Sequence, residues 1–117
     1  MLEQRFVTRR AEGRTTLVMF LTAGDPNLET TLQLMHDLTA AGVDVIELGY
    51  PFSDPILDGP TLQRANRRAL NGNGSLEATL DLAKRFRQTD KTTPIVLMGY
   101  YHPIVAFGVT NFVDRAA

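Results

Sequence analysis

The chain has 117 residues, of which 44% are hydrophobic and 21% charged, and its formal net charge is -1. This composition is typical of one globular domain and excludes a disordered chain, and the near-zero charge gives no electrostatic reason to expect nucleic acid or an anionic membrane as a partner. The lack of cysteine excludes disulfides and thiolate metal sites, and we expect no metal. No stretch approaches the ~20 apolar residues that cross a bilayer, and residues 1–10 lack the pattern of a signal peptide, so we expect a cytoplasmic protein.

The first half of the chain alternates apolar runs with a helical pattern. Residues 15–22, "TTLVMFLT", are mostly apolar and predict a strand that is buried on both faces. The segment 28–42 repeats apolar residues at helical spacing and ends at a glycine, which predicts a helix. Residues 43–49, "VDVIELG", predict a second strand.

The second half repeats this order after a proline-rich corner. Residues 61–70 predict a helix, and "NGNG" at 71–74 is a turn cluster. Ser75 is expected to cap a helix over 76–87. Residues 94–101, "PIVLMGYY", predict a third strand, and Thr110 is expected to cap a short last helix over 111–117.

The alternation of strands and helices predicts an α/β fold with parallel strands and right-handed crossovers. An open doubly wound sheet and a (β/α)₈ barrel both have this order. The nucleotide-binding form of the open sheet needs a glycine-rich fingerprint after the first strand, which "TAGDPN" lacks, so the pattern favours the barrel. Because a barrel needs roughly 250 residues, we expect 1–117 to be a single partial domain with three strand–helix units. Either the chain is a fragment of a longer protein, which we favour, or copies pair to cover the open edges.

Side-chain alternation in the second strand places one carboxylate toward the barrel interior. Ile46 and Leu48 share one face and suit the helix side, which sends Glu47 inward, near the carboxyl end of its strand. Catalytic groups of such barrels lie at that end. The neighbouring strands are expected to direct three large side chains to the same place, namely Phe20, Met98 and Tyr100.

Three carboxylates lie in the stretch "ELGYPFSDPILDGP", residues 47–60. Each has a structural alternative to a functional role. Glu47 could pair with an arginine or lysine elsewhere, Asp58 could cap the following helix, and Asp54 could be a turn residue. The prolines of this stretch restrict its backbone, so it could hold a carboxylate at a fixed place over a pocket.

These residues resemble the alpha subunit of tryptophan synthase. The resemblance rests on "FLTAGDP" (20–26), "AGVDVIELGYPFSDPILDGPTLQRANRRAL" (41–70) and "PIVLMGYY" (94–101), which together span most of the chain. The pattern "ELG-P-FSDP---DGP" is highly specific. The resemblance implies a (β/α)₈ barrel, of which this chain is the N-terminal part, and the cleavage of indole-3-glycerol phosphate to indole and glyceraldehyde 3-phosphate without a cofactor.

The resemblance also assigns roles to residues. Glu47 matches the family's catalytic glutamate and Asp58 its catalytic aspartate. The indole ring is expected to be enclosed by Phe20, Met98 and Tyr100. The expected partner is a beta subunit that uses pyridoxal phosphate, and the interface candidates are Pro51, Asp54 and Pro103.

Two positions depart from the family pattern, and one feature is missing. His102 stands where the family usually has asparagine, and Leu57 stands where it usually has alanine. The family's phosphate-binding loops follow the last barrel strands, so the 117-residue chain alone is expected to be inactive. Two other readings stay open: a non-catalytic docking module for a beta-type partner, and a freestanding indole-releasing lyase. The pairs Arg9-Arg10 and Arg67-Arg68, and His36, are expected to be solvated.

Overall fold

A computed structural model describes residues 1–117, and it contains three strands and six helices. The strands are β1 (Val18–Thr22), β2 (Val45–Gly49) and β3 (Ile95–Met98). The helices are α1 (Leu2–Ala11), α2 (Leu28–Ala40), α3 (Pro60–Asn71), α4 (Leu76–Arg87), α5 (Tyr101–Phe107) and α6 (Val109–Ala116). None of these helices combines the length and the apolar content that crossing a membrane requires.

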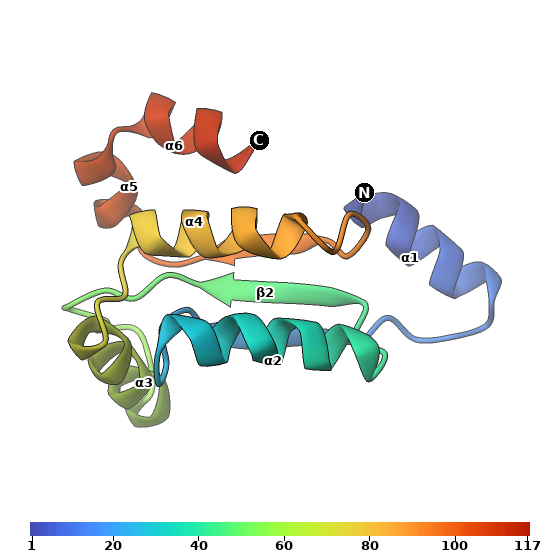
Figure 1. The fold of residues 1–117 in the computed structure, drawn as a ribbon, viewed down its shortest axis with the longest axis horizontal. Coiled ribbons are helices and arrows are strands. Elements are labelled where there is room, and N and C mark those ends of the chain that lie inside the picture. Colours follow the sequence, from blue (N-terminus) through green and yellow to red (C-terminus); the bar gives the residue numbers. More distant parts are fainter.

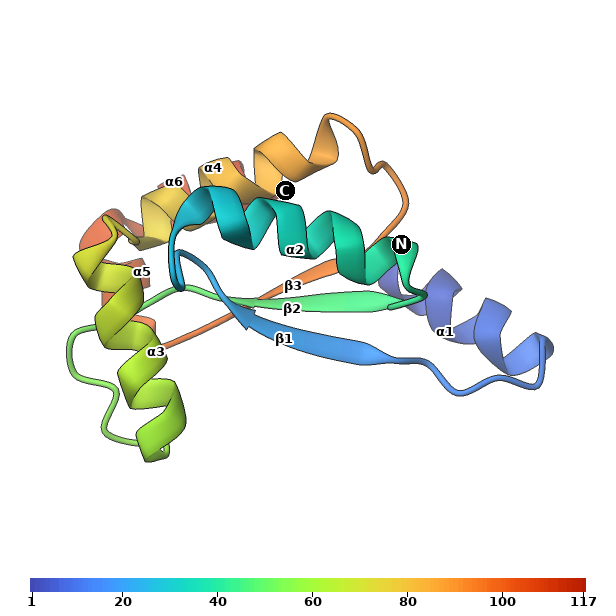
Figure 2. The same ribbon diagram turned by 60° about the horizontal axis from the view of Figure 1, so that its bottom comes forward.

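The three strands form one parallel sheet in the order β1-β2-β3, as the alternating pattern predicts. The register pairs Glu47 of β2 with Phe20 of β1 and Val96 of β3. Helices α2 and α4 lie against the same face of the sheet (Figure 2). Helix α1 lies at the amino-terminal end of the strands, whereas α3 and α5 lie at their carboxyl end (Figure 1).

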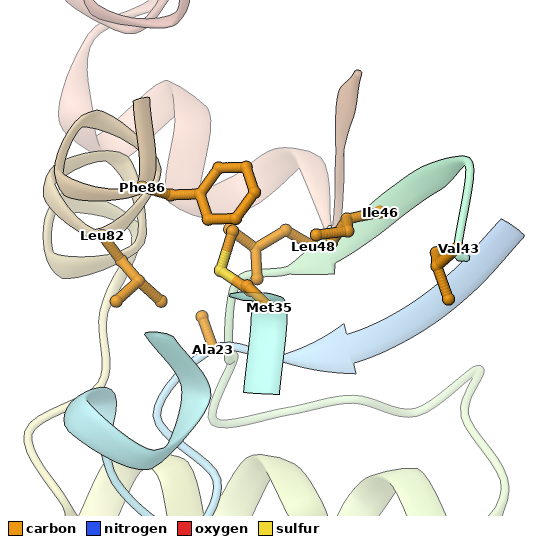
Figure 3. Close-up of a cluster of buried hydrophobic side chains, with 7 residues drawn as sticks. All are labelled: Ala23, Met35, Val43, Ile46, Leu48, Leu82 and Phe86. Carbon is orange, nitrogen blue, oxygen red and sulfur yellow. The ribbon is translucent and has the colours of Figure 1, made fainter. Parts of the chain in front are cut away.

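The hydrophobic core lies between the sheet and helices α2 and α4, as Figure 3 shows. Ile46 and Leu48 of β2 are fully buried there against Met35 of α2 and Phe86 of α4. Burial of each such side chain stabilises the fold by roughly 1.5–3 kcal/mol. The prediction that Ile46 and Leu48 face the helices is therefore confirmed, and Glu47 between them faces the other way.

The opposite face of the sheet carries no layer of helices (Figure 2). Val18, Val96 and Met98 are exposed on this face, Met98 by 45%. Each outer strand is paired on one side only. We call the face of the sheet opposite α2 and α4 the inner face, since it corresponds to the interior of the expected barrel.

The structure departs from the predicted elements mainly at the ends of the chain. Helices α1 and α5 are additional elements, and β3 ends at Met98 rather than at residue 101. The strand ends there because its partner β2 ends at Gly49, which pairs with Met98. The ring of Tyr50 covers the next residue, Gly99, where an added Cβ would lie 2.3 Å from that ring. Thr110 is not a cap, because α6 begins at Val109, directly after Gly108. Ser75 does cap α4, since its hydroxyl accepts the N–H of Ala78 at 3.0 Å.

Of the arginines that were expected to be solvated, Arg9 is instead partly buried in an ion pair, whereas Arg68 is exposed, as expected, and forms a surface ion pair. Arg9 of α1 pairs with the buried Asp44, which also accepts the main-chain N–H of Leu17 at 3.0 Å. Arg68 of α3 forms a bidentate ion pair with Asp25 in the loop after β1. Its Nε donates to Oδ1 at 2.7 Å and its Nη2 donates to Oδ2 at 2.8 Å. These pairs fasten α1 and α3 to opposite ends of the sheet.

His36 was also expected to be solvated, but it is half-buried. Its ring stacks on that of Phe86, with the two centroids 4.7 Å apart. His36 therefore belongs to the margin of the α2–α4 core.

Candidate active site

A hollow of about 480 Å³ opens at the carboxyl end of the strands, where the loops after β2 and β3 meet. Its wall includes Phe20 and Thr22 from β1, Met98 from β3, and Asp58 from the loop between β2 and α3. Tyr100 contributes from the start of α5. The structure thus brings together four of the five residues predicted to act on or enclose a substrate.

The fifth residue, Glu47, lies on the inner face next to this hollow but does not line it. It is half-buried between Phe20 and Val96. All ion pairs of the chain involve other carboxylates, so the structural alternative of a paired Glu47 is not realised within these 117 residues. The Glu47 carboxylate is therefore left without an ion-pair partner, on the face of the sheet that also carries Phe20.

The floor of the hollow depends on a glycine at the end of β2. An added Cβ at Gly49 would lie 2.7 Å from the Phe20 ring, closer than real Cβ atoms approach. The ring of Phe20 therefore lies across Gly49, on the side of the sheet that carries Glu47. A flat apolar ring beside a carboxylate suits the binding of another flat aromatic group.

Asp58 lies on the segment that follows β2, residues 50–59, which we call the acidic loop. The N-cap of α3 is Gly59, no side chain caps this helix, and Pro60 is its first residue. The structural alternative of Asp58 as a helix cap is therefore not realised. The side chain of Gln63 donates to the Asp58 carbonyl at 2.9 Å, so the backbone is held while the carboxylate takes part in no ion pair.

Asn66 of α3 is a site residue that the sequence reasoning missed. It is only 8% exposed, its side-chain oxygen accepts the Phe52 N–H at 2.8 Å, and its amide donates to the Leu62 carbonyl at 2.8 Å. Asn66 therefore ties the start of the acidic loop to α3. A polar residue beside the apolar stripe of Leu62, Ala65 and Ala69 was the signal that could have revealed it.

Tyr50 is a second residue that the sequence reasoning missed. It is buried at the end of β2, and burial raises the pKa of its hydroxyl. That hydroxyl donates to the Tyr100 carbonyl at 2.9 Å. The Tyr100 hydroxyl accepts the main-chain N–H of Leu57 at 2.9 Å, and its ring lies 5.2 Å from that of Phe52. These contacts link the ends of β2 and β3 to the acidic loop.

Of the predicted interface residues, Asp54 is exposed on the acidic loop, Pro103 of α5 is half-buried, and Pro51 is buried. Pro51 and Pro103 line one open groove of about 440 Å³, together with Phe107 of α5. Asp54 lies in a neighbouring hollow of about 300 Å³ with Arg67 of α3. Asp54 is exposed and accepts the Ser53 hydroxyl at 2.6 Å, an arrangement that also suits a turn residue.

The two positions that depart from the resembled pattern are both exposed. The Leu57 side chain is 86% exposed and reaches the rim of the 480 Å³ hollow. The His102 ring lies 5.8 Å from that of Phe52. The larger side chain at position 57 is thus accommodated at the surface without displacing the loop from α3.

Comparison with known proteins identifies a family model and solved structures that match this chain. The tryptophan synthase alpha chain family model matches residues 6–117. A tryptophan synthase subunit alpha from Legionella pneumophila str. Paris is 42% identical, with a TM-score of 0.95 over 97% of this chain and 44% of that chain. Tryptophan synthase from M. tuberculosis is 33% identical, with a TM-score of 0.89 over 97% and 46%. A mutant alpha subunit from Pyrococcus furiosus is 46% identical, with a TM-score of 0.80 over 86% and 40%.

The chain therefore spans less than half the length of these solved relatives. Its three strand–helix units match the first part of their (β/α)₈ barrel, which confirms the predicted fold class.

Proposed function

Because the chain belongs to the tryptophan synthase alpha chain family, we propose that it carries the acid–base residues that cleave indole-3-glycerol phosphate to indole and glyceraldehyde 3-phosphate. The observation that carries this proposal is the 480 Å³ hollow, where Asp58 joins the aromatic and apolar walls of Phe20, Met98 and Tyr100. A mostly apolar hollow with one convergent carboxylate suits a flat ring that has a single N–H to donate.

Glu47 is the proposed proton carrier. Cleavage of the carbon–carbon bond requires the ring carbon at the broken bond to gain a proton and the adjacent hydroxyl to lose one. A glutamate held beside an apolar ring can give the first proton and take the second, so its protonation state is restored. The inner-face location of Glu47 next to Phe20 supports this role.

Asp58 is the proposed stabiliser of charge. Protonation of the ring carbon leaves positive charge on the indole nitrogen. An ionised Asp58 that accepts the indole N–H opposes this charge where it develops, and such stabilisation by a fixed group is often the largest catalytic effect. The availability of the Asp58 carboxylate, which caps no helix, supports this role. No cofactor is needed in this chain for these steps.

The proposed partner is a tryptophan synthase beta subunit that uses pyridoxal phosphate. The groove that contains Pro51 and Pro103, with Asp54 beside it, is the proposed contact surface. The same groove supports the alternative of a docking module, in which the acidic loop engages a partner and Glu47 has no chemical role. A freestanding lyase would use the same hollow without that groove.

The test uses a chimera in which residues 1–117 replace the matching part of the Legionella pneumophila alpha subunit, the 0.95 TM-score relative. Indole release from indole-3-glycerol phosphate is measured for the chimera and for Glu47→Gln and Asp58→Asn. Glu47→Gln is expected to lose about 10²- to 10⁴-fold in kcat, the usual contribution of a proton-transfer group. Asp58→Asn is expected to lose about 10²- to 10³-fold, the usual contribution of a fixed group that stabilises developing charge. Asp54→Asn is the matched control, since it removes a carboxylate from the same loop but outside the 480 Å³ hollow.

The same variants separate the proposal from the docking module. If Glu47→Gln retains both lyase activity and beta-subunit activation, the docking module is favoured and the catalytic role of Glu47 is wrong. If Glu47→Gln loses cleavage but retains beta-subunit binding, the catalytic role stands.

A further inference from the structure

Tyr100 does more than line the hollow. Its hydroxyl oxygen accepts the main-chain N–H of Leu57 at 2.9 Å, across 43 positions of sequence. Leu57 directly precedes Asp58 on the acidic loop. The hydroxyl of Tyr100 is therefore one residue away, along the backbone, from the carboxylate proposed to face the indole nitrogen.

Beyond Tyr50, which bonds to the end of β3 at the start of the acidic loop, the other side-chain supports of the loop come from the helix that follows it. Asn66 holds the Phe52 N–H, and Gln63 holds the Asp58 carbonyl, and both belong to α3. The bond to Tyr100 instead connects the loop to the end of β3. Because the Leu57 side chain is 86% exposed, packing does not hold this residue, and its main-chain hydrogen bond is the contact that fixes it.

Tyr100 is itself held from two sides. Its carbonyl accepts the Tyr50 hydroxyl at 2.9 Å, and its ring lies 5.2 Å from that of Phe52 at an angle of 35°. Tyr50 is in turn buried against Gly99. Because these contacts hold Tyr100, its hydroxyl has a fixed position. A group that orients a catalytic residue needs such a fixed position.

We propose that Tyr100 is a positioning residue, whose hydroxyl fixes Leu57 and thereby places the Asp58 carboxylate against the indole N–H. This inference rests on the proposed function. The ring of Tyr100 and its hydroxyl then have separate tasks. The ring encloses the substrate, and the hydroxyl sets the loop that carries Asp58.

Tyr100→Phe in the chimera separates these tasks, because it keeps the ring and removes only the hydroxyl. We expect kcat to fall about five- to tenfold, the effect of one lost hydrogen bond. KM should stay within about twofold, since the ring still encloses the substrate. A raised KM with unchanged kcat, or no change in either, would overturn the proposal.

A double-mutant cycle tests whether the hydroxyl acts through Asp58. Rates are measured in single turnovers with enzyme in excess, so that slow variants remain measurable. In the Asp58→Asn background, Tyr100→Phe should change the rate less than about twofold, because the carboxylate it positions is gone. In the background of Asp37→Asn, an exposed residue of α2 outside the acidic loop, the full five- to tenfold effect should remain. An equal effect in both backgrounds would overturn the proposal.

A measurement on the parent chimera guards against variants that fold poorly. With ¹⁵N-leucine labelling, the Leu57 amide should exchange slowly with solvent, and Tyr100→Phe should shift its resonance. A rapidly exchanging Leu57 amide in the parent overturns the proposal without any variant. If Asp58→Asn leaves kcat unchanged, the proposed function fails, whereas a loss in Asp58→Asn with none in Tyr100→Phe defeats only this inference.

Discussion

Replacing Gly99 with alanine adds one methyl group, and this group should displace the Tyr50 ring, which supports Tyr100 in the candidate active site. The new Cβ would lie 2.3 to 2.7 Å from three carbons of the Tyr50 ring, which is 5% exposed and has little room to move. The ring must shift, and its hydroxyl then loses the Tyr100 carbonyl that it bonds at 2.9 Å.

Two effects contribute to the expected loss of stability. Overpacking of a buried ring costs about 1–3 kcal/mol, and the lost hydrogen bond about 1 kcal/mol more. A total of about 2–4 kcal/mol corresponds to a fall in Tm of roughly 5–15 °C for a barrel of this family's size. Because Tyr100 moves with Tyr50, kcat for indole release should also fall.

The assay is thermal unfolding of the chimera, followed by circular dichroism, together with indole release. Gly59→Ala is the matched control, because no atom lies within 4 Å of an added Cβ at Gly59. Its Tm should change by less than about 3 °C, the usual range for a substitution without a clash. If Gly99→Ala and Gly59→Ala change the Tm equally, the close contact between Tyr50 and Gly99 does not support the site, and our reasoning is wrong.

Three further predictions concern stability at low pH, partner binding and the isolated chain. Burial by itself would raise the pKa of Asp44, but the N–H of Leu17 and the guanidinium of Arg9 outweigh burial and lower that pKa. The ionised Asp44 therefore stabilises the fold fully above the ordinary aspartate pKa of about 3.9. This stabilisation is lost as the pH falls through the lowered pKa. Asp44→Asn should therefore unfold more readily at pH 7 and lose less stability between pH 4 and pH 2, as measured by urea midpoints, whereas Asp114→Asn on the exposed face of α6 should keep the parent profile. Asp54→Lys should weaken binding of the chimera to a tryptophan synthase beta subunit about tenfold in calorimetric titration. Indole release in the absence of that subunit should stay unchanged. Equal affinities of Asp54→Lys and Asp37→Lys for the beta subunit would show that the acidic loop is not the contact. The purified 117-residue chain should release no detectable indole because its inner face and outer strand edges are open, and release that Glu47→Ala abolishes would contradict this expectation.

Strand faces were predictable from the sequence because they follow from a strict period of two. Ile46 and Leu48 had to share a face, and their bulk selected the helix side, so Glu47 had to face inward. The same rule correctly placed Phe20 and Met98 on the face of Glu47, with Phe20 as its direct register partner. The specific motif from Glu47 to Pro60 then identified the family.

Other features were not predictable because they depend on contacts across the sequence. The run of residues 94–101 is apolar throughout, so its pattern could not show that β3 ends at Met98, opposite the last residue of β2, or that Tyr50 covers Gly99. Helix α5 includes Pro103, which the first turn of a helix tolerates, although a proline usually suggests a loop. The partner of Arg9 is a buried aspartate 35 positions away, which no local pattern reveals.

The crystal structure of the Glu47→Gln chimera with indole-3-glycerol phosphate bound tests the central claim most directly. We expect the indole ring against Phe20 and Met98, its N–H donating to the Asp58 carboxylate, and the side chain of residue 47 in contact with the carbon–carbon bond to be broken. Substrate bound away from the 480 Å³ hollow, or out of reach of either residue 47 or Asp58, would contradict the account.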